Sequence, residues 1–491
     1  MLRPKKAGRI PGVRRDFKLL AAALVLCLSV SRHTYAADQI TSGNNAQALK
    51  AALEADGFVV QKGKFKVVDL FGMYDAGIVP SCFGNNPTSP YLLPLVPLAP
   101  GQTPENLPIA NPITDYPLVP EDKGLYMEYF LKPEEAIVLV GKTPPEVKYF
   151  GLRSYLARRY LSSSDSYKYI FASLGDTANN FTTATADSGD PYGQPVMYIS
   201  TADAGTDRRV RAAASAAGYP SGIINTDVLP APLIKLGTTG TPDSFLILQR
   251  AALFADPLAQ EAYYADPGVT VFRITPKRSA NREPFAIPEL RVKGTGHTKE
   301  LDLLKTEDEL GQAILARYDG LSPRDLQTSV AFEAGYDAIQ RNTDALGDNR
   351  DTIYLRSDTF FLRERPDDFV IVYGPNHATT GKAVYSNFGI YGRIALNGVG
   401  SVDDTKFPTA EEFLPGNPLA KYFYVYKIAR HCESSEAIPC LAVPTGPGAM
   451  GIPVTQPATL AFRAYVEPST KVGPAYEEVL YDRAIKFNPQ R

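Results

Sequence analysis

The chain has 491 residues, with 51 basic and 53 acidic residues, four cysteines and no tryptophan. Eight of the basic residues and one of the acidic residues lie within positions 1–36, so the rest of the chain has a net charge near −9. Nucleic-acid binding requires a basic footprint, and this charge therefore argues against a nucleic-acid partner. The roughly 455 residues beyond position 36 exceed the size at which one hydrophobic core stops growing. We therefore expect two closely packed subdomains, residues 37–300 and 301–491.

Residues 1–36 have the three parts of a cleavable signal peptide. A basic start with one acid, Asp16, precedes an apolar run over 19–30, and small residues in 34–36 precede a cut before Ala37. The twelve-residue apolar run is shorter than the roughly 20 residues that span a bilayer. We predict export to the periplasm or the extracellular space, with no stable membrane span after signal removal. An uncut membrane anchor is the alternative.

Residues 14–18, RRDFK, resemble the bacterial twin-arginine signal, in which two arginines precede a variable residue and a phenylalanine. The resemblance covers these five residues only. It departs at Val13, where that signal usually has Ser or Thr, and at Lys18, which lies one place early. The resemblance implies export of the folded protein by the twin-arginine route. An ordinary signal peptide with an arginine-rich start is the alternative.

Three cysteines follow the signal segment. Cys432 and Cys440 flank the short polar segment 433–439, and we predict that they form a disulfide, which an oxidising compartment allows. Closing so short a loop stabilises the fold by roughly 2–3 kcal/mol in the entropic model. Cys82 is then a buried, unpaired thiol.

Taken in chain order, the elements begin with a short helix over 44–55 and a strand pair over 57–61 and 65–70. Residues 80–120 then hold eleven prolines. Proline has no N–H to donate to a neighbouring strand, so this stretch reads as a long wrapping loop and not as a central strand. Its apolar residues indicate that it lies on the body of the protein.

Strand patterns dominate the segment up to residue 274. Runs of β-branched and aromatic residues broken by Gly, Pro, Asp and Ser predict strands over 126–131, 136–140, 148–156, 168–173, 195–200, 245–253 and 269–274. Two helices interrupt them, one over 206–217 capped by Asp207 and one over 257–264.

Two helices are expected after residue 300. Thr306 and Glu309 have the spacing of a capping box, and Ser322 and Pro323 open a second helix that continues to about Asn342. The rest reads as strands over 351–362, 369–373, 382–396, 421–429 and 459–466. The order of strands, then helices, then strands predicts an α+β fold of mostly antiparallel sheets with a few central helices.

A polar turn over 372–387 is the leading candidate for chemistry, because it joins two strong strands and holds Asn376, His377, Lys382 and Tyr385. Unperturbed histidine titrates near neutrality, so His377 is the candidate general base. Lys382 and Tyr385 are candidates to bind or protonate an anion, and Asn376 to contact the substrate. The alternative is a solvent-facing turn in which Asn376 and His377 satisfy local backbone groups.

A second candidate lies on the strand over 148–156. Alternation places Arg153, Tyr155 and Ala157 on one face, where a guanidinium fork beside a tyrosine can clamp a carboxylate. The alternative is that these arginines form structural ion pairs.

Several chemistries lack support in the sequence. The three histidines beyond the signal, His297, His377 and His431, lack the spacing of a helical metal site, and no serine-hydrolase elbow, phosphate loop or haem motif occurs. We therefore predict no cofactor and no metal.

The leading hypothesis is an exported hydrolase or lyase for a small anionic organic substrate. In it, His377, Tyr385 and Lys382 are the catalytic candidates, and substrate binding falls to Arg153, Tyr155 and Asn376. On this hypothesis His377→Ala abolishes turnover and leaves folding nearly intact. A non-catalytic exported ligand-binding or cell-envelope protein is the alternative.

Overall fold

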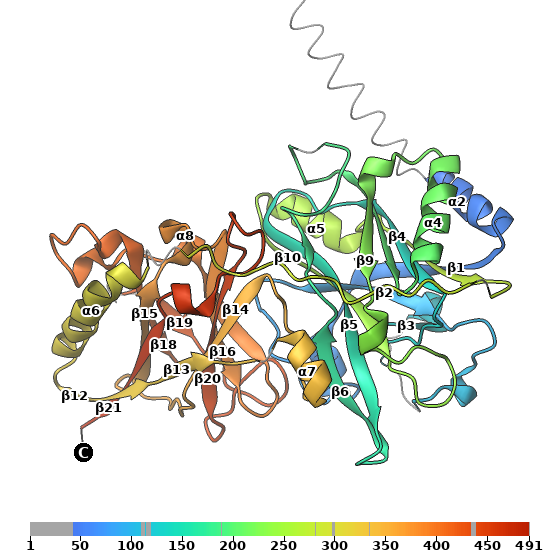
Figure 1. Ribbon diagram of the computed structural model, residues 1–491. Coiled ribbons are helices and arrows are strands. Elements are labelled where there is room, and N and C mark those ends of the chain that lie inside the picture. Colours follow the sequence, from blue (N-terminus) through green and yellow to red (C-terminus); the bar gives the residue numbers. More distant parts are fainter. Residues whose placement is uncertain are drawn as a thin grey trace, which may run out of the picture.

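The computed structural model of the protein describes residues 43–109, 113, 119–187, 189–279, 281–296, 300–332, 334–433 and 438–490. The predicted signal peptide and His297 lie outside these residues. Three sheets and a small number of helices form the molecule (Figure 1). Within the described residues, no helix is both long and apolar enough to cross a membrane.

An eleven-stranded sheet is built from residues 58–276 (Figure 1, blue to green). Its order is β6-β5-β10-β2-β1-β11-β4-β8-β9, with β3 beside β2 and β7 beside β5, and only the β8–β9 pair is parallel among the described strands of this sheet. The strands are β1 (Phe58–Val67), β2 (Tyr91–Pro97), β3 (Leu125–Tyr126), β4 (Ala136–Lys142), β5 (Val147–Leu161), β6 (Ser166–Ser173), β7 (Ala178–Asn179), β8 (Pro195–Thr201), β9 (Ile224–Val228), β10 (Phe245–Phe254) and β11 (Thr270–Pro276).

Four helices accompany this sheet: α2 (Gly43–Ala55), α3 (Leu70–Asp75), α4 (Ala204–Ala216) and α5 (Pro257–Ala265). The apolar sides of α2 and α4 bury Leu49, Leu53 and Val210 against residues of β4 and β8. The predicted helices over 44–55 and 257–264 are confirmed. The helix predicted over 206–217 is also present, but its N-cap is Asp203, which accepts from the backbone N–H of Thr206, and not Asp207.

Two five-stranded sheets make up the second half (Figure 1, yellow to red). The second sheet has the order β12-β21-β15-β18-β19 and the third has the order β13-β14-β20-β16-β17. The strands are β12 (Leu321–Leu326), β13 (Thr328–Val330), β14 (Thr352–Ser357), β15 (Phe369–Pro375), β16 (Tyr385–Gly392), β17 (Gly398–Asp403), β18 (Phe423–Ala429), β19 (Cys440–Ala442), β20 (Ala458–Tyr465) and β21 (Arg483–Pro489), and the helices are α6 (Leu304–Arg317), α7 (Gly335–Arg341) and α8 (His377–Thr380).

The third sheet has two chemically different faces, because side chains alternate along each strand. Ile353, Phe388 and Phe462 belong to the apolar face, which packs on Val370 and Ile428 of the second sheet. The opposite face carries aromatic and basic side chains toward the first sheet: Tyr354, Arg356, Tyr391, Arg463 and Tyr465.

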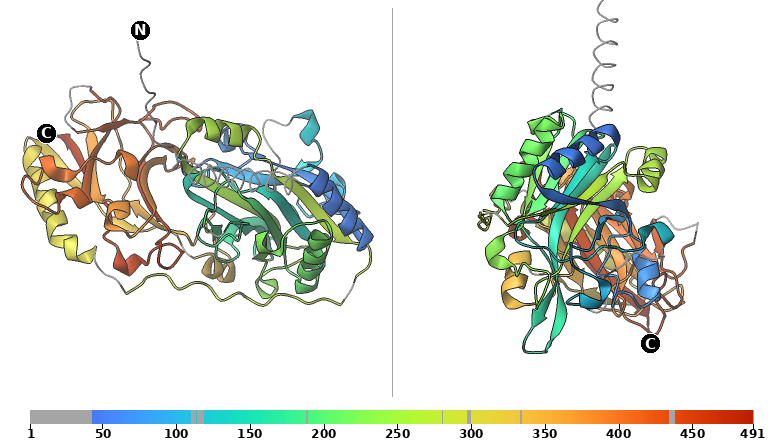
Figure 2. Two further views of the ribbon diagram at one scale, coloured as in Figure 1. Left: turned by 90° about the horizontal axis from the view of Figure 1, so that it is seen from above. Right: turned by 90° about the vertical axis from the view of Figure 1, so that its right-hand side faces the viewer.

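The two halves lie side by side in an elongated molecule, and residues 281–296 run along its outside from one half to the other (Figure 2). Residues 82–88 of the first half lie against the third sheet. The contacts include Cys82 N–H to Ala395 O (2.7 Å), Gly84 N–H to Leu396 O (2.9 Å), Tyr391 O–H to Asn85 O (2.8 Å) and Asn387 Nδ2 to Asn86 Oδ1 (2.7 Å). Hydrogen bonds therefore join the halves directly.

The strand pair predicted over 57–61 and 65–70 is wrong, because β1 is a single strand. Gly63 lies in the middle of β1, where β2 comes very close. A Cβ at this position would lie 2.2 Å from the carbonyl oxygen of Leu95. The glycine marks a close backbone approach and not a turn.

The prediction that the proline-rich stretch cannot supply a central strand is also wrong. β2 lies between β10 and β1, with Leu92, Leu95 and Val96 fully buried. Pro94 pairs with Phe65 of β1, while β10 pairs only with Tyr91 and Leu92. The missing N–H of Pro94 therefore lies beyond the β10 pairing and does not interrupt it.

Two expectations for residues 304–342 are wrong as well. Thr306 lies inside α6, which begins at Leu304, and its side chain does not cap the helix. Residues 321–330 form β12 and β13 in place of the helix expected over 322–342. Only α7, near the end of that range, is helical. Pro323 lies on β12, an edge strand, which is the position in a sheet that tolerates proline.

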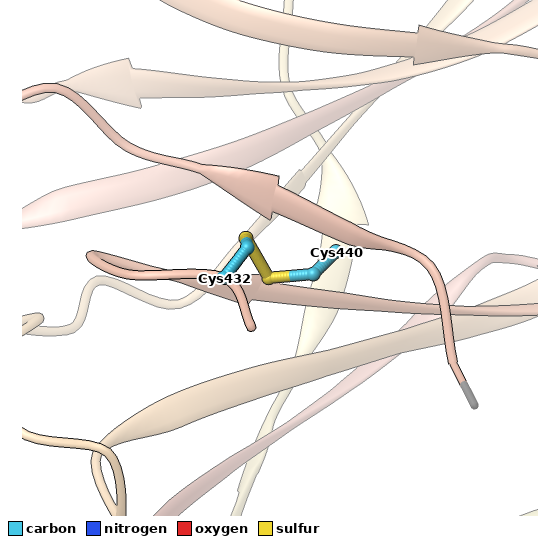
Figure 3. Close-up of a disulfide and its surroundings, with 2 residues drawn as sticks. All are labelled: Cys432 and Cys440. Atoms are coloured by element: carbon cyan, nitrogen blue, oxygen red, sulfur yellow. A yellow bond between two sulfur atoms is a disulfide. The ribbon is translucent and has the colours of Figure 1, made fainter. Parts of the chain in front are cut away.

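The predicted disulfide between Cys432 and Cys440 is present, with a Cα–Cα distance of 5.6 Å (Figure 3). Cys82 is free and buried, as predicted.

Candidate functional site

His377 does not lie on a solvent-facing turn. It begins α8 between β15 and β16 and is 2% exposed. Its Nδ1 lies 3.0 Å from both carboxylate oxygens of Glu300, and its Nε2 lies 3.5 Å from Asp482 Oδ2. Burial disfavours the charged ring, but the two carboxylates outweigh it and raise the pKa of His377 to about 10. A histidine that is protonated at neutral pH has no lone pair for general-base chemistry.

Lys382 and Asn376 are also engaged. Lys382 Nζ lies 2.5 Å from Glu478 and 3.1 Å from Glu467, and the lysine is buried. The side-chain oxygen of Asn376 accepts hydrogen bonds from the first backbone N–H groups of α8. Asn376 therefore satisfies local backbone groups, as the alternative interpretation expected.

The remaining predicted residues lie elsewhere. Arg153 forms an ion pair with Asp227 at 2.7 Å. Tyr385 is buried, and its ring stacks on Tyr465 with centroids 5.0 Å apart. The Tyr155 hydroxyl accepts from Arg250 Nη1 at 2.6 Å. The six predicted residues therefore do not converge on one site, although Tyr155 and Tyr385 lie directly behind the wall of the cavity described next.

A cavity lies between the first sheet and the third sheet and has an empty volume of about 850 Å³, open solvent included. Most of its lining is apolar: Val68, Leu70, Met73, Val79, Phe83, Leu93, Ile113, Met127, Phe171, Leu246 and Leu248. Arg250 and Arg463 are the two charged residues among those that line it in the described part of the chain. We call this space the arginine cavity.

Each arginine reaches the cavity from a strand of a different sheet. Arg250 of β10 is 4% exposed and donates to Tyr155 and to the carbonyl oxygen of Gly347 (2.8 Å). Arg463 of β20 is 3% exposed and donates to the Tyr391 hydroxyl (2.6 Å) and the carbonyl oxygen of Gly84 (2.7 Å). All four acceptors are uncharged at neutral pH, because burial raises the pKa of Tyr155 and of Tyr391 to about 12.

Neither guanidinium has a carboxylate within 4.0 Å among the described residues. The buried Asp348 interacts with Arg250 at longer range, but its oxygens accept from the backbone N–H groups of Ser173 and Gly335, and burial raises the pKa of its carboxyl. Removing a charge from water costs several kcal/mol unless a partner compensates for it. The two buried cations of this cavity therefore have no described carboxylate in direct contact.

Other buried arginines differ from this pair. Arg153, Arg159 and Arg273 form ion pairs with Asp227, Asp243 and Glu135, respectively. Arg430 has no such carboxylate, but its guanidinium donates to the carbonyl oxygens of Leu362, Val443 and Pro444 and does not line the cavity. Arg250 and Arg463 combine burial, the absence of a close carboxylate and access to empty space.

Aromatic rings surround the guanidiniums and the apolar end. The ring centroid of Tyr354 lies 5.6 Å from Arg463 Cζ. The Tyr354 hydroxyl has no hydrogen-bond partner among the described residues. At the apolar end, Phe83 contacts Phe171, with centroids 5.2 Å apart. Phe83, Phe171 and Leu346 line the cavity with positive φ angles of 50°, 28° and 51°. Such strained backbone is concentrated at functional sites in proteins.

The sequence carried a signal for these arginines. In β10, Leu246, Leu248 and Arg250 alternate on one face of a largely apolar strand, and in β20 Arg463 occupies a comparable position. A lone arginine in an apolar strand is buried and needs a partner. The sequence could not indicate that no partner is supplied. The described residues also contain no cluster of three or more His, Cys, Asp or Glu side chains that could hold a metal ion.

Comparisons with family models and with curated proteins find no match to this sequence. Two solved structures share a distant likeness. The VPA0106 protein from Vibrio parahaemolyticus is 10% identical with a TM-score of 0.38, over 92% of this chain and 98% of that chain. An uncharacterized protein from Burkholderia cenocepacia is 11% identical with a TM-score of 0.37, over 96% of this chain and 98% of that chain. Neither likeness carries a functional argument.

Proposed function

We propose that the protein binds a small organic anion with a large apolar part in the arginine cavity. The observation that carries the proposal is the pair of buried guanidiniums, Arg250 and Arg463, without a carboxylate within 4.0 Å. An anionic group of the ligand supplies the missing negative charge, and the apolar part fills the space beside Phe83 and Phe171.

The chemistry of the two ends supports this assignment. A guanidinium offers a planar fork of donors that suits carboxylate and phosphate oxygens. Hydrogen bonds to charged groups contribute about 1.5–3 kcal/mol each, and the low dielectric of a buried site strengthens them. The free Tyr354 hydroxyl is a further donor for the anionic group.

Binding is favoured over hydrolase or lyase chemistry by the composition of the cavity wall. Its described polar lining consists of arginine and tyrosine side chains, without a carboxylate or a histidine. The candidate general base, His377, is engaged with Glu300 elsewhere. The ligand-binding alternative from the sequence therefore becomes the leading function.

Calorimetric titration tests the proposal with decanoate and 4-phenylbutyrate as anionic probes and decanol as the neutral match. We expect both anions to bind and decanol to bind more weakly. Arg250→Met and Arg463→Met should each weaken anion binding about 10- to 100-fold, which corresponds to the loss of one or two charge-assisted hydrogen bonds. Arg208→Gln is the control, because Arg208 forms an exposed pair with Glu283 away from the cavity. Equal affinity for decanol and decanoate would contradict the proposal.

The proposed setting is an oxidising, exported compartment. The charge and hydropathy pattern of residues 1–36 and the Cys432–Cys440 disulfide support it. N-terminal sequencing of the protein recovered outside the cytoplasm should begin at Ala37 or Asp38. An intact residue 1 on membrane-bound protein would contradict export by cleavage.

A further inference from the structure

A second hollow continues outward from the arginine cavity. It has an empty volume of about 910 Å³, open solvent included, and shares five lining residues with the cavity: Gly84, Phe332, Leu346, Tyr354 and Arg463. Because these residues belong to both walls, the two spaces meet at Arg463. We call the second space the outer hollow.

Three arginines line the outer hollow, namely Arg356, Arg393 and Arg463, and no acidic residue does so among the described residues. Neither Arg356 nor Arg393 has a side-chain hydrogen bond or an ion pair with another residue of the described part of the chain. Other arginines at the surface, such as Arg208 and Arg317, form ion pairs with carboxylates.

The register of the third sheet explains why these arginines gather. Arg356 of β14 lies opposite Ala461 of β20. Tyr354, two residues earlier on β14 and on the same face, lies opposite Arg463. Arg393 directly follows β16, two positions after Tyr391. The small side chain of Ala461 leaves open space between these residues, which is the outer hollow.

The electrostatic arrangement is unfavourable without an added anion. Arg356 and Arg393 are partly buried and near enough to interact, since burial and the charge of Arg356 both lower the pKa of Arg393. Arg463 and Arg250 extend the same positive charge inward. Like charges in a space with reduced solvent access repel one another, and bound anions relieve that repulsion.

We propose that the natural ligand carries at least two negative charges at its polar end, with Arg250 and Arg463 holding the inner charge and Arg356 and Arg393 the outer one. The chemical class is an amphipathic dianion, either a phosphate monoester or a dicarboxylate with an apolar tail. The tail lies in the apolar part of the arginine cavity, and the polar end bridges the junction at Arg463. The inference rests on the proposed function, because it assigns the ligand class of the same site.

Probes whose alkyl tails differ by one carbon at most test the inference by calorimetry at pH 8, where an alkyl phosphate is a dianion. The probes are decanoate, decyl phosphate and decylmalonate, each below its micelle concentration. We expect at least one dianion to bind about tenfold or more tightly than decanoate, as one additional charge-assisted hydrogen bond predicts. A preference for decyl phosphate identifies the phosphate class, and a preference for decylmalonate identifies the dicarboxylate class.

The variant pair Arg356→Gln/Arg393→Gln should remove the preference for dianions and leave decanoate affinity within about threefold, because Gln removes only the outer charges. Arg365→Gln is the control, since Arg365 is exposed and paired with Asp367. Equal binding of all three probes by the wild type, or a preference that survives in the double variant, would overturn the inference while the proposed function stands. Failure of all three probes to bind would overturn the proposed function itself.

Discussion

Two regions of this protein bury cations, and they compensate for them differently. Around α8, His377 and Lys382 each face two carboxylates from the same chain. In the arginine cavity, Arg250 and Arg463 face tyrosine hydroxyls, backbone carbonyls and empty space. A buried cation with internal carboxylates is part of the scaffold, whereas one that lacks them and also lines empty space is available to a ligand. The position of the carboxylates, more than that of the cations, distinguishes a structural cation from a candidate binding group.

Removing His377 gives the largest effect expected from this contrast. His377→Ala leaves the buried carboxylate of Glu300 without its cation, and breaking a buried pair in this way costs about 3–5 kcal/mol. Urea denaturation should show a loss of that size. This replaces the sequence-based expectation that His377→Ala leaves folding nearly intact. A variant with wild-type stability would return His377 to the list of candidate functional residues.

The pH dependence of the free energy of unfolding is the second test of this contrast. The folded-state pKa of His377, about 10, lies above its ordinary value of 6.5. Its contribution to the free energy of unfolding is therefore fully present below pH 6.5 and is lost as the pH rises through about 10. The readout is the difference in the free energy of unfolding between the wild type and His377→Gln. This difference is needed because burial lowers the pKa of Lys293 to about 8, so that Lys293 also titrates in this window in both proteins. A constant difference from pH 6 to pH 10 would show that the ring is not held in its charged form.

Arg463→Met should have the smallest effect on stability of the unliganded protein. The change leaves the Gly84 carbonyl without its donor, which costs about 1–3 kcal/mol, but it strands no carboxylate and removes an uncompensated charge. We expect a net loss below that of His377→Ala, measured under the same conditions. At a decanoate concentration 100 times the dissociation constant, the wild type should gain about 2.7 kcal/mol and the variant much less. A loss as large as that of His377→Ala would indicate that Arg463 is structural.

Local sequence patterns predicted much of the secondary structure. The strands over 136–140 and 148–156 are β4 and β5, since runs of branched and aromatic residues leave few other conformations. Strand order is decided by distant parts of the chain, and there the prediction failed. β2 lies between β1 and β10 despite Pro94, and β12 pairs with the last strand, β21, where a helix was expected.

The candidate site could be predicted from the sequence only in part. The pairing of an arginine with Tyr155 occurs in the cavity with Arg250 in place of Arg153, because Arg250 donates to the Tyr155 hydroxyl. The choice between the two arginines depends on Asp227, which pairs with Arg153 from a distant strand. Whether an arginine has a partner is a tertiary property, and no local pattern reports it.

The contacts of residues 82–88 have a consequence for the order in which the protein matures during synthesis. Asn86 binds Tyr385 across 299 positions, and Gly84 accepts from Arg463 across 379 positions. Closing such distant contacts is slow, because the chain between them must first be ordered. An elongating chain therefore holds one wall of the cavity, with its apolar lining uncovered, until β20 has been synthesised. On the proposed function, the capacity to bind a ligand therefore arises only after both walls of the cavity have been made.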